Sequence, residues 1–202
     1  MVLQLAYYKM FGVSRPTYES SQTRKFQHGR TETTRSVSAH SIAWLKAMED
    51  PYVSVEQKAE LGRKAVAAHV AYLNDAVEGK GVDRHLLGLR MSLLPGEAKP
   101  AIFTDPTYSF SSHWYMSTSQ LTSEYFEGYG WGEVVPDGFG IAYMVKNNSL
   151  HFNVAGLKNL VVHGQRVGGP EQMRHYLEEA ASDMRLVFES QLAKSEGVKA
   201  KL

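Results

Sequence analysis

The chain has 202 residues, a formal net charge of +1 and no cysteine. This length suits one domain with a sizeable core, and the near-zero charge gives no basic field that would steer the chain to nucleic acid or an anionic membrane. The lack of cysteine excludes disulfides and thiolate metal sites, and no apolar run approaches the roughly 20 residues that span a bilayer.

The first half of the sequence predicts helices. Apolar residues recur at helical spacing in four stretches, at residues 2–10, 38–48, 54–78 and 82–91. The third is the strongest, because Ser54 and Gln57 fit a capping box and Gly79 ends the pattern. The fourth is a short helix or a turn. Residues 16–27 read as an extended segment or loop, and residues 94–106 as a loop.

The second half predicts strands. Runs rich in aromatic and β-branched residues lie at residues 114–120, 139–145 and 150–155, with a further short run at 160–162. Asn147 and Asn148 indicate a turn that joins the second and third strands in a hairpin. Pro170 opens a long amphipathic helix that reaches Leu192. This mixture of helices and strands predicts the α/β or α+β class.

Two polar stretches suggest recognition of an anion. Residues 25–35 read KFQHGRTETTR, which suits an anion site, a phosphate loop or an ordinary polar turn. Arg84 suits bidentate binding of a carboxylate or phosphate. The alternative for Arg84 is a local pair with Asp83 at the start of a helix, which contributes little at a surface.

A pair of serines on a predicted strand could hold a small ligand. Side chains alternate along a strand, so Ser117 and Ser119 share one face, about 6.5–7 Å apart, and Thr118 faces the other way. The alternative is a half-exposed strand with polar outward positions. The eight histidines show no paired metal-binding spacing, so we predict no metal, and His69 reads as a packed or surface residue of a helix.

Six motifs in order carry a resemblance to a known family: LQLAYYKMFG, PTYES, FQHGRTETTRS, DRHLLGL, YMSTSQ and EVVPDGFGIAY. From Leu3 onward the chain resembles the carboxy-terminal half of the carnitine/choline acyltransferase family, closest to its carnitine acetyl-transferring members. The resemblance implies reversible transfer of a short acyl group between coenzyme A and the hydroxyl of carnitine. It also implies a mixed β-sheet flanked by helices, one half of a two-domain, chloramphenicol acetyltransferase-like fold.

The resemblance implies roles for the anion-binding candidates. Carnitine carries a carboxylate, a hydroxyl and a trimethylammonium group, and Tyr18, Thr31 and Arg84 would bind the carboxylate. Two hydroxyls and a guanidinium suit charge-assisted hydrogen bonds to one anion. The stretch at 25–35 would therefore serve an anion site through Thr31.

We expect the two arginines of that stretch, Arg30 and Arg35, to orient the loop or to pair with Glu19 and Glu32.

The resemblance also implies a reaction centre. Ser119 would donate to the oxyanion of the tetrahedral intermediate, with Ser117 beside the substrate and Trp131 against the trimethylammonium group. Ser20 and Gln120 would contact the pantetheine arm of coenzyme A.

Three positions bear on substrate choice, and a fourth, Val70, bears on coenzyme A. Thr31 and Arg84, which the choline-specific members lack, favour carnitine. Tyr129 stands where long-chain members have a glycine, so its ring would block a long acyl tail. The alternatives are that Tyr129 swings away or that the alignment slips by one residue among the flanking glycines. Val70 replaces an arginine that some relatives direct toward coenzyme A.

The family's general base is a histidine of the amino-terminal half, and no histidine here fits its motif. We therefore expect a chain that lacks this half and part of the coenzyme A grip, and that exposes apolar surface. A non-catalytic carnitine-binding module, a medium-chain carnitine acyltransferase and a choline transferase are the alternatives.

The last three residues predict a targeting signal. Ala200, Lys201 and Leu202 form a close variant of the Ser-Lys-Leu signal that the peroxisomal import receptor reads. We expect residues 1–195 to form the carnitine-binding domain and residues 196–202 a flexible tail. The predicted location is the peroxisome, with the mitochondrion as a second site.

Overall fold

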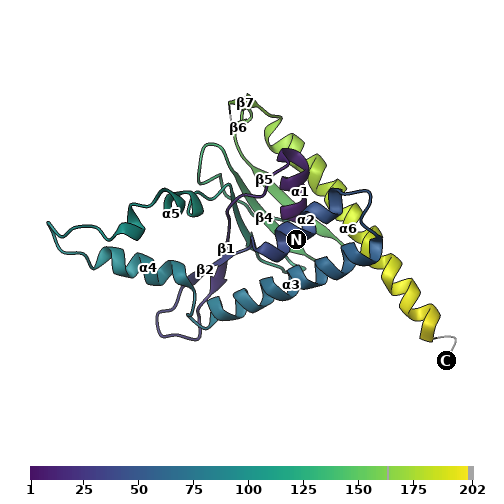
Figure 1. Cartoon of the computed structure of the whole chain (residues 1–202), viewed down its shortest axis with the longest axis horizontal. Coiled ribbons are helices and arrows are strands. Elements are labelled where there is room, and N and C mark those ends of the chain that lie inside the picture. Colours follow the sequence, from purple (N-terminus) through teal and green to yellow (C-terminus); the bar gives the residue numbers. More distant parts are fainter. Residues whose placement is uncertain (163, 200–202) are drawn as a thin grey trace. The chain divides into compact units, whose positions relative to one another are not determined.

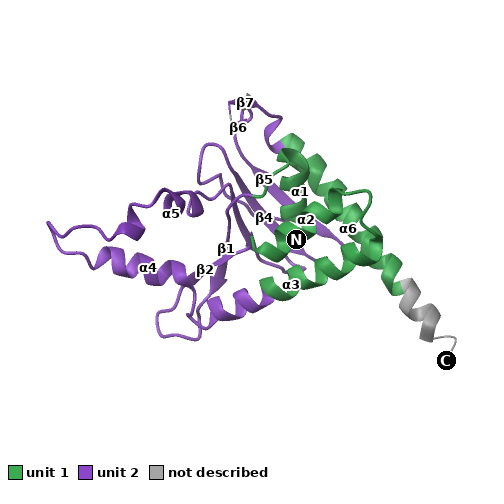
Figure 2. Cartoon of the chain, in the orientation of Figure 1, with its two compact units in different colours: residues 1–14, 37–69, 171–202 green, residues 15–36, 70–170 purple. Residues whose placement is uncertain are grey.

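The computed structural model describes residues 1–162 and 164–199, and the chain divides into two compact units (Figure 2). Unit 1 is helical and contains Met1–Ser14, Val37–His69 and, of the residues that the structure describes, 171–199. Unit 2 contains Arg15–Ser36 and Val70–Pro170 and holds the β-sheets.

The elements follow one another along the chain as Figure 1 labels them. The helices are α1 (Val2–Phe11), α2 (Ala39–Glu49), α3 (Val55–Val77), α4 (Val82–Met91), the 3-10 turn η1 (Ala101–Phe103), α5 (Pro106–Ser111) and α6 (Gly169–Lys199). The strands are β1 (Thr17–Gln22), β2 (Thr31–Arg35), β3 (Met116–Gln120), β4 (Phe139–Val145), β5 (Leu150–Ala155), β6 (Val161–Val162) and β7 (Gln165–Arg166).

Most of the predicted elements are confirmed. The Ser54–Gln57 capping box forms, because the Gln57 backbone N–H donates to the Ser54 hydroxyl and the Gln57 side chain accepts from the Ser54 N–H. The predicted hairpin joins β4 and β5. Strand β2, the short helix α5 and the turn η1 were not predicted, and α6 continues past Leu192 to Lys199.

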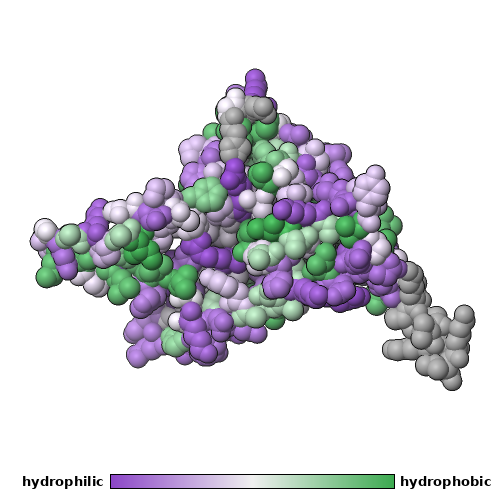
Figure 3. All heavy atoms as spheres, viewed as in Figure 1, coloured by the Kyte–Doolittle hydropathy of each residue, from purple (hydrophilic) through white to green (hydrophobic). Residues whose placement is uncertain are grey.

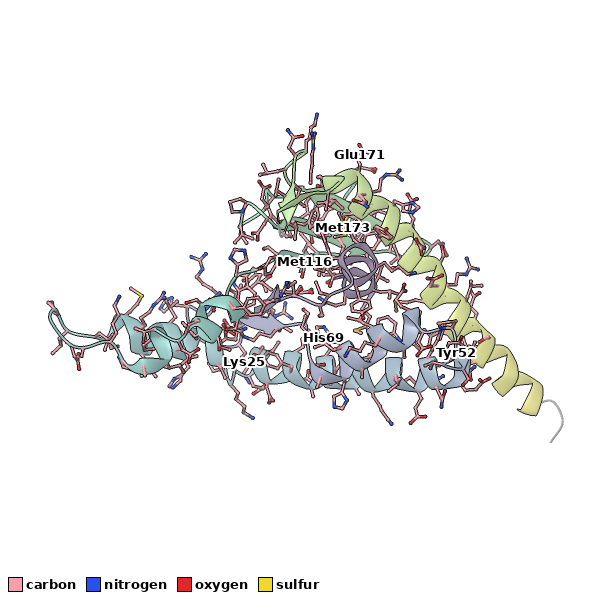
Figure 4. All side chains as sticks on the ribbon, turned by 45° about the horizontal axis from the view of Figure 1, so that its top comes forward. Lys25, Tyr52, His69, Met116, Glu171 and Met173 are labelled. Atoms are coloured by element: carbon pink, nitrogen blue, oxygen red, sulfur yellow. The ribbon has the colours of Figure 1, made fainter. Side chains whose placement is uncertain are left out.

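Unit 1 packs aromatic and aliphatic side chains between its helices. Leu5 of α1 and Trp44 of α2 are fully buried, as is Met173 in the first turns of α6 (Figure 4). Gly62 of α3 lies against Trp44 and Phe188, where an added Cβ would come within 2.8 Å of the Phe188 ring. A side chain at residue 62 would therefore require the Phe188 and Trp44 rings to shift.

Unit 2 is built on a five-stranded mixed sheet with the order β2-β1-β3-β4-β5. Strands β1, β3 and β4 run parallel to one another, and the edge strands β2 and β5 pair antiparallel. Met116, Phe139 and Ile141 are fully buried and share one face of the sheet, where they form its apolar core. The mixed sheet and the helices confirm the predicted α/β class.

Helix α4 and the loop after it expose apolar side chains (Figure 3). None of the α4 residues is buried, and Met91 and Leu94 are 76% and 71% exposed. Exposed apolar surface was expected from the sequence. None of the described helices is long and apolar enough to cross a membrane.

Candidate functional site

One face of the sheet in unit 2 carries a row of hydroxyl groups. Side chains directly opposite each other on paired strands point to the same face. The register pairs Tyr18 with both Ser117 and Arg35. Alternation along the strands then defines the hydroxyl face, whose members are Tyr18, Ser20, Thr31, Thr33, Ser117 and Ser119. Ser117 and Ser119 thus share a face opposite to Thr118, as the sequence predicts.

Arg84 is held against Thr31. Its Nε donates to the Thr31 carbonyl at 3.0 Å, and its Nη2 donates to the Thr31 hydroxyl at 3.3 Å. The Thr31 hydroxyl accepts in this contact, so its own hydrogen stays available to a ligand. Thr31 and Arg84 are 53 residues apart in sequence, and β2 and α4 bring them together.

A cavity of about 310 Å³ lies beside this contact. Tyr18 and Arg84 both line it, with Trp114, whose ring centroid lies 5.7 Å from that of Tyr18. The cavity is bounded further by residues that the sequence reasoning missed, namely Thr33, Asp83, Leu87, Arg90, Phe103, Tyr108, Ser109 and Ser112. Two guanidinium groups and several hydroxyls make it suited to a small anion.

The first turn of α4 is attached to β2, which places Arg84. The N-cap Gly81 has no side chain to cap the helix, and the Glu32 carboxylate accepts from the Arg84 backbone N–H at 3.3 Å instead. A Cβ on Gly81 would lie 2.4 Å from Cγ of Glu32. Glycine at this position therefore lets the helix approach the strand.

Arg35 makes a bidentate ion pair with Asp83, with Nη2 to Oδ1 at 2.7 Å and Nε to Oδ2 at 3.0 Å. The expected pairing of Arg35 with Glu19 or Glu32 is wrong, because α4 brings Asp83 to the end of β2. The local Asp83–Arg84 alternative is wrong for the same reason, because Asp83 faces Arg35 while Arg84 turns to Thr31.

The serines of β3 lie beside β1 and under a loop. The hydroxyls of Ser20 and Ser119 are 3.3 Å apart, within hydrogen-bonding distance. Ser117 is the register partner of Gly140, and a Cβ on Gly140 would lie 2.5 Å from the Gly132 carbonyl oxygen. The Trp131–Gly132 backbone therefore rests on the hydroxyl face next to Ser117. The buried indole N–H of Trp131 has no hydrogen-bond partner among the described residues.

Tyr129 is fixed by its hydroxyl, which lies 2.7 Å from the Ser119 carbonyl and 3.2 Å from the Tyr143 carbonyl. Burial raises the pKa of Tyr129, so the hydroxyl stays protonated and able to donate. Tyr129 and its neighbours Glu127 and Gly128 line a second cavity of about 380 Å³, whose other walls are Ala142, Tyr143, Met144, His151, Phe152 and Asn153 of β4 and β5.

The opposite face of the sheet holds a half-buried polar network. The Glu19 carboxylate accepts from the Tyr143 hydroxyl at 2.6 Å and from Thr118 at 3.2 Å. Burial, and then the charge of Glu19, raise the pKa of Tyr143 strongly. Gln120 is the register partner of Tyr143, so it points away from Ser20 and Ser119, and its side chain donates to Thr122.

Among the described residues, no group of three or more His, Cys, Asp or Glu side chains could hold a metal ion. His69 lies in α3 and is half-buried (Figure 4).

Comparison with known proteins shows the family to which the chain belongs. The sequence pattern described as Choline/Carnitine o-acyltransferase matches residues 1–179. The chain belongs to the choline/carnitine O-acyltransferase family. Its relatives include carnitine O-acetyltransferase of Rattus norvegicus, 40% identical over 191 residues, which are 94% of this chain and 30% of that protein.

Two further relatives show the breadth of the match to the choline/carnitine O-acyltransferase family. The mitochondrial carnitine O-acetyltransferase of Saccharomyces cerevisiae is 39% identical over 184 residues, which are 91% of this chain and 27% of that protein. The peroxisomal carnitine O-octanoyltransferase of Homo sapiens is 37% identical over 155 residues, 73% of this chain and 25% of that protein. The chain thus spans 30% or less of these relatives' length.

Proposed function

We propose that this chain forms the carnitine-binding part of a carnitine O-acetyltransferase, with acetyl-coenzyme A as the co-substrate. One observation carries the proposal. Arg84, hydrogen-bonded to Thr31, shares a cavity with Tyr18 at the edge of the face that presents Ser117 and Ser119. These are the residues that the family motifs single out.

In this proposal the carboxylate of carnitine binds between Arg84, Thr31 and Tyr18. Arg84 donates its Nε–H and one Nη2–H to Thr31, which leaves its other N–H groups available to the anion. The Thr31 hydroxyl hydrogen completes the set, with the Tyr18 phenol across the cavity. Arg84 and Thr31 are exposed in this chain, so each charge-assisted bond should contribute less than the roughly 1.5–3 kcal/mol that is typical of bonds shielded from water.

The acyl transfer begins at the carnitine hydroxyl. A histidine of the remaining part of a family-length protein removes its proton, and the alkoxide attacks the thioester carbonyl. The C–S bond of the tetrahedral intermediate then breaks, and the coenzyme A thiolate takes the proton back from the histidine. If Ser20 donates to Ser119, the Ser119 hydrogen is free to bind the oxyanion, and removing such a donor costs about 10²–10³ in rate.

The cationic end and the coenzyme have their own contacts in the proposal. The Trp131 indole lies over the trimethylammonium group, a contact that contributes roughly 0.5–2 kcal/mol. The pantetheine arm passes the end of β1 and β3, where Ser20 and Gln120 lie on opposite faces. Val70 offers no charge to coenzyme A.

Acyl-chain length is set by Tyr129 in this proposal. Its hydroxyl is tied to two strands, which supports a fixed blocking ring and hence an acetyl or other short acyl group. The medium-chain reading has one observation in its favour, the 380 Å³ cavity behind Tyr129. Tyr129→Gly should increase octanoyl transfer relative to acetyl transfer, and a variant with an unchanged ratio would show that Tyr129 does not limit chain length.

A chimaeric protein, called the graft, distinguishes the hypothesis of an enzyme from that of a non-catalytic module. In the rat carnitine O-acetyltransferase, the matching 191 residues are replaced by this chain, and release of the coenzyme A thiol is followed. We expect turnover by the graft and carnitine binding without turnover by the 202-residue chain. Arg84→Ala in the graft should raise the carnitine KM at least tenfold, whereas Arg174→Ala, at an exposed arginine of α6, should not. An unchanged KM for Arg84→Ala would refute the carboxylate assignment.

The proposed peroxisomal address, Ala200-Lys201-Leu202, lies outside the described residues, as does its contact with the import receptor. We keep it as a proposal, with the mitochondrion as a second location. A fluorescent fusion that ends in these residues should reach peroxisomes. Continued import after their deletion would contradict the assignment.

A further inference from the structure

We propose that Arg35 and Asp83 are a positioning pair that fixes the direction of Arg84. This inference rests on the carboxylate-binding role proposed for Arg84. Neither Arg35 nor Asp83 belongs to the set of residues that we assign to carnitine, and the pairing was not predicted from the sequence.

The Arg35 guanidinium contacts three residues. Besides the two bonds to Asp83, its Nη1 donates to the Ser111 carbonyl at 2.6 Å, at the end of α5. Its guanidinium carbon lies 4.8 Å from the centroid of the Trp114 ring. One side chain of β2 thus contacts the start of α4, the end of α5 and the residue that leads into β3.

The pair is shielded from water. The side chains of Arg35 and Asp83 are 22% and 12% exposed, whereas exposed ion pairs of this protein such as Lys64–Glu60 are 57% and 64% exposed. Bidentate geometry and low exposure are the conditions under which an ion pair resists thermal and salt disruption. The Arg35–Asp83 ion pair is therefore a rigid connection between β2 and α4, which we call the joint.

The joint matters because α4 is weakly anchored by its own side chains. The helix has no buried residue and no side-chain cap, and besides the Arg35–Asp83 pair the hydrogen bonds between its first turn and β2 in the described residues involve the Glu32 carboxylate and Thr31. Asp83 directly precedes Arg84 in the first turn. If the joint opened, the first turn would move away from β2, and Arg84 would lose its fixed orientation toward the cavity.

The joint also supports the other side of the cavity. Tyr18 is the register partner of Arg35, and the Tyr18 ring contacts the Trp114 ring that the Arg35 guanidinium covers. Arg35 is thus placed to hold both Tyr18 and Arg84 toward one cavity. Its loss should weaken binding of a ligand with a carboxylate and leave a ligand without one unaffected.

The test measures the orientation of Arg84 without any ligand. In the ¹⁵N-labelled 202-residue chain, the Arg84 Nε–H, which donates to the Thr31 carbonyl in an exposed contact, should exchange with water more slowly than the Nε–H of a free arginine. Asp83→Asn keeps the shape of the side chain and removes its charge, and it should accelerate this exchange at least tenfold. Arg35→Met should do the same, and Arg35→Lys should have an intermediate effect. Arg174→Met, which removes an exposed ion pair with Glu178 in α6, is the control, with no change expected.

Calorimetry with carnitine and with choline supplies the second readout. Asp83→Asn should weaken the binding of carnitine at least tenfold and the binding of choline less than twofold. In an Arg84→Ala background, Asp83→Asn should not weaken carnitine binding further. Unchanged Arg84 exchange in Asp83→Asn would overturn the positioning role, as would equal losses for both ligands. If exchange accelerates but Arg84→Ala binds carnitine like the parent, the joint is real and the proposed carboxylate site is wrong. If Arg35→Met unfolds the chain, Asp83→Asn decides.

Discussion

Replacing Lys9 with methionine tests how the helices of unit 1 are held together. The Lys9 ammonium lies 3.0 Å from Glu49 of α2 and 2.7 Å from both Glu179 and Asp183 of α6. The side chain of Lys9 is only 8% exposed, whereas its partners are 38–42% exposed. Burial opposes the charge of Lys9, but the bonds to Asp183, Glu179 and Glu49 together raise its pKa well above the ordinary value. The Lys9→Met variant keeps the aliphatic stem and leaves three carboxylates facing each other.

The expected loss follows from these exposures. Breaking a buried ion pair costs about 3–5 kcal/mol, and an exposed pair contributes about 0–1 kcal/mol. The carboxylates can regain water, so we expect an intermediate loss of about 2 kcal/mol, or roughly 4–8 °C in the unfolding midpoint of a chain of this size. Because the folded pKa of Lys9 is raised, its contribution is complete below the unfolded value of about 10.4 and disappears only as the pH rises above it.

The assay is urea unfolding at neutral pH, with Lys64→Met as the matched control. Lys64 makes an exposed pair with Glu60 on the surface of α3, and its replacement should change stability by less than about 0.5 kcal/mol. Adding Asp183→Asn to Lys9→Met should recover part of the loss, because one unpaired charge is removed. Equal effects of Lys9→Met and Lys64→Met would show that the three ion pairs of Lys9 do not stabilise unit 1.

Two further predictions concern unit 2. Gly81→Ala places a Cβ 2.4 Å from Glu32 and should destabilise the chain by about 1–3 kcal/mol. In the control Gly88→Ala, in helix α4, the added Cβ meets nothing within 4 Å and should stabilise the chain by up to about 1 kcal/mol. Thermal unfolding compares the two variants, and equal shifts of the unfolding midpoint would contradict the close approach of Gly81 to Glu32. Tyr143 keeps its proton in the folded state because burial and Glu19 raise its pKa, so the stability that it contributes is complete below about pH 10 and declines above it. Titration of tyrosine absorbance should therefore show the same number of tyrosines ionising in Tyr143→Phe as in the parent until the chain unfolds, and one fewer in the variant would contradict this.

Much of the fold could be predicted where local pattern and structure agree. The capping box at Ser54 and the hairpin at Asn147 are local features, and both form as predicted. The alternation of β3 correctly places Ser117 and Ser119 on one face. Periodicity sufficed in these cases because each depends on residues a few positions apart.

Strand β2 could not be predicted from its sequence, Thr31–Arg35, which has no apolar residue. Its middle residues are nevertheless buried, and their polar groups have tertiary partners: Thr34 bonds Ser21, and Glu32 accepts from the α4 backbone. A polar strand of this kind is stabilised by contacts that only the complete fold supplies.

The site was only partly predictable for the same reason. Family motifs pointed to Tyr18, Thr31 and Arg84, but no periodicity joins residues so far apart in the chain. The Arg35–Asp83 joint was missed because each residue has nearer partners of opposite charge in the sequence. Register on β2 and the attachment of α4 decide between those partners.

A crystal structure of the chain soaked with carnitine would show where the carboxylate binds. We expect the carboxylate about 2.7–2.9 Å from the Arg84 guanidinium, within hydrogen-bonding reach of Thr31 and Tyr18, and the carnitine hydroxyl turned toward Ser119. A carboxylate bound elsewhere, such as against the arginines of the β1–β2 loop, with the Arg84 cavity occupied only by water, would contradict this expectation.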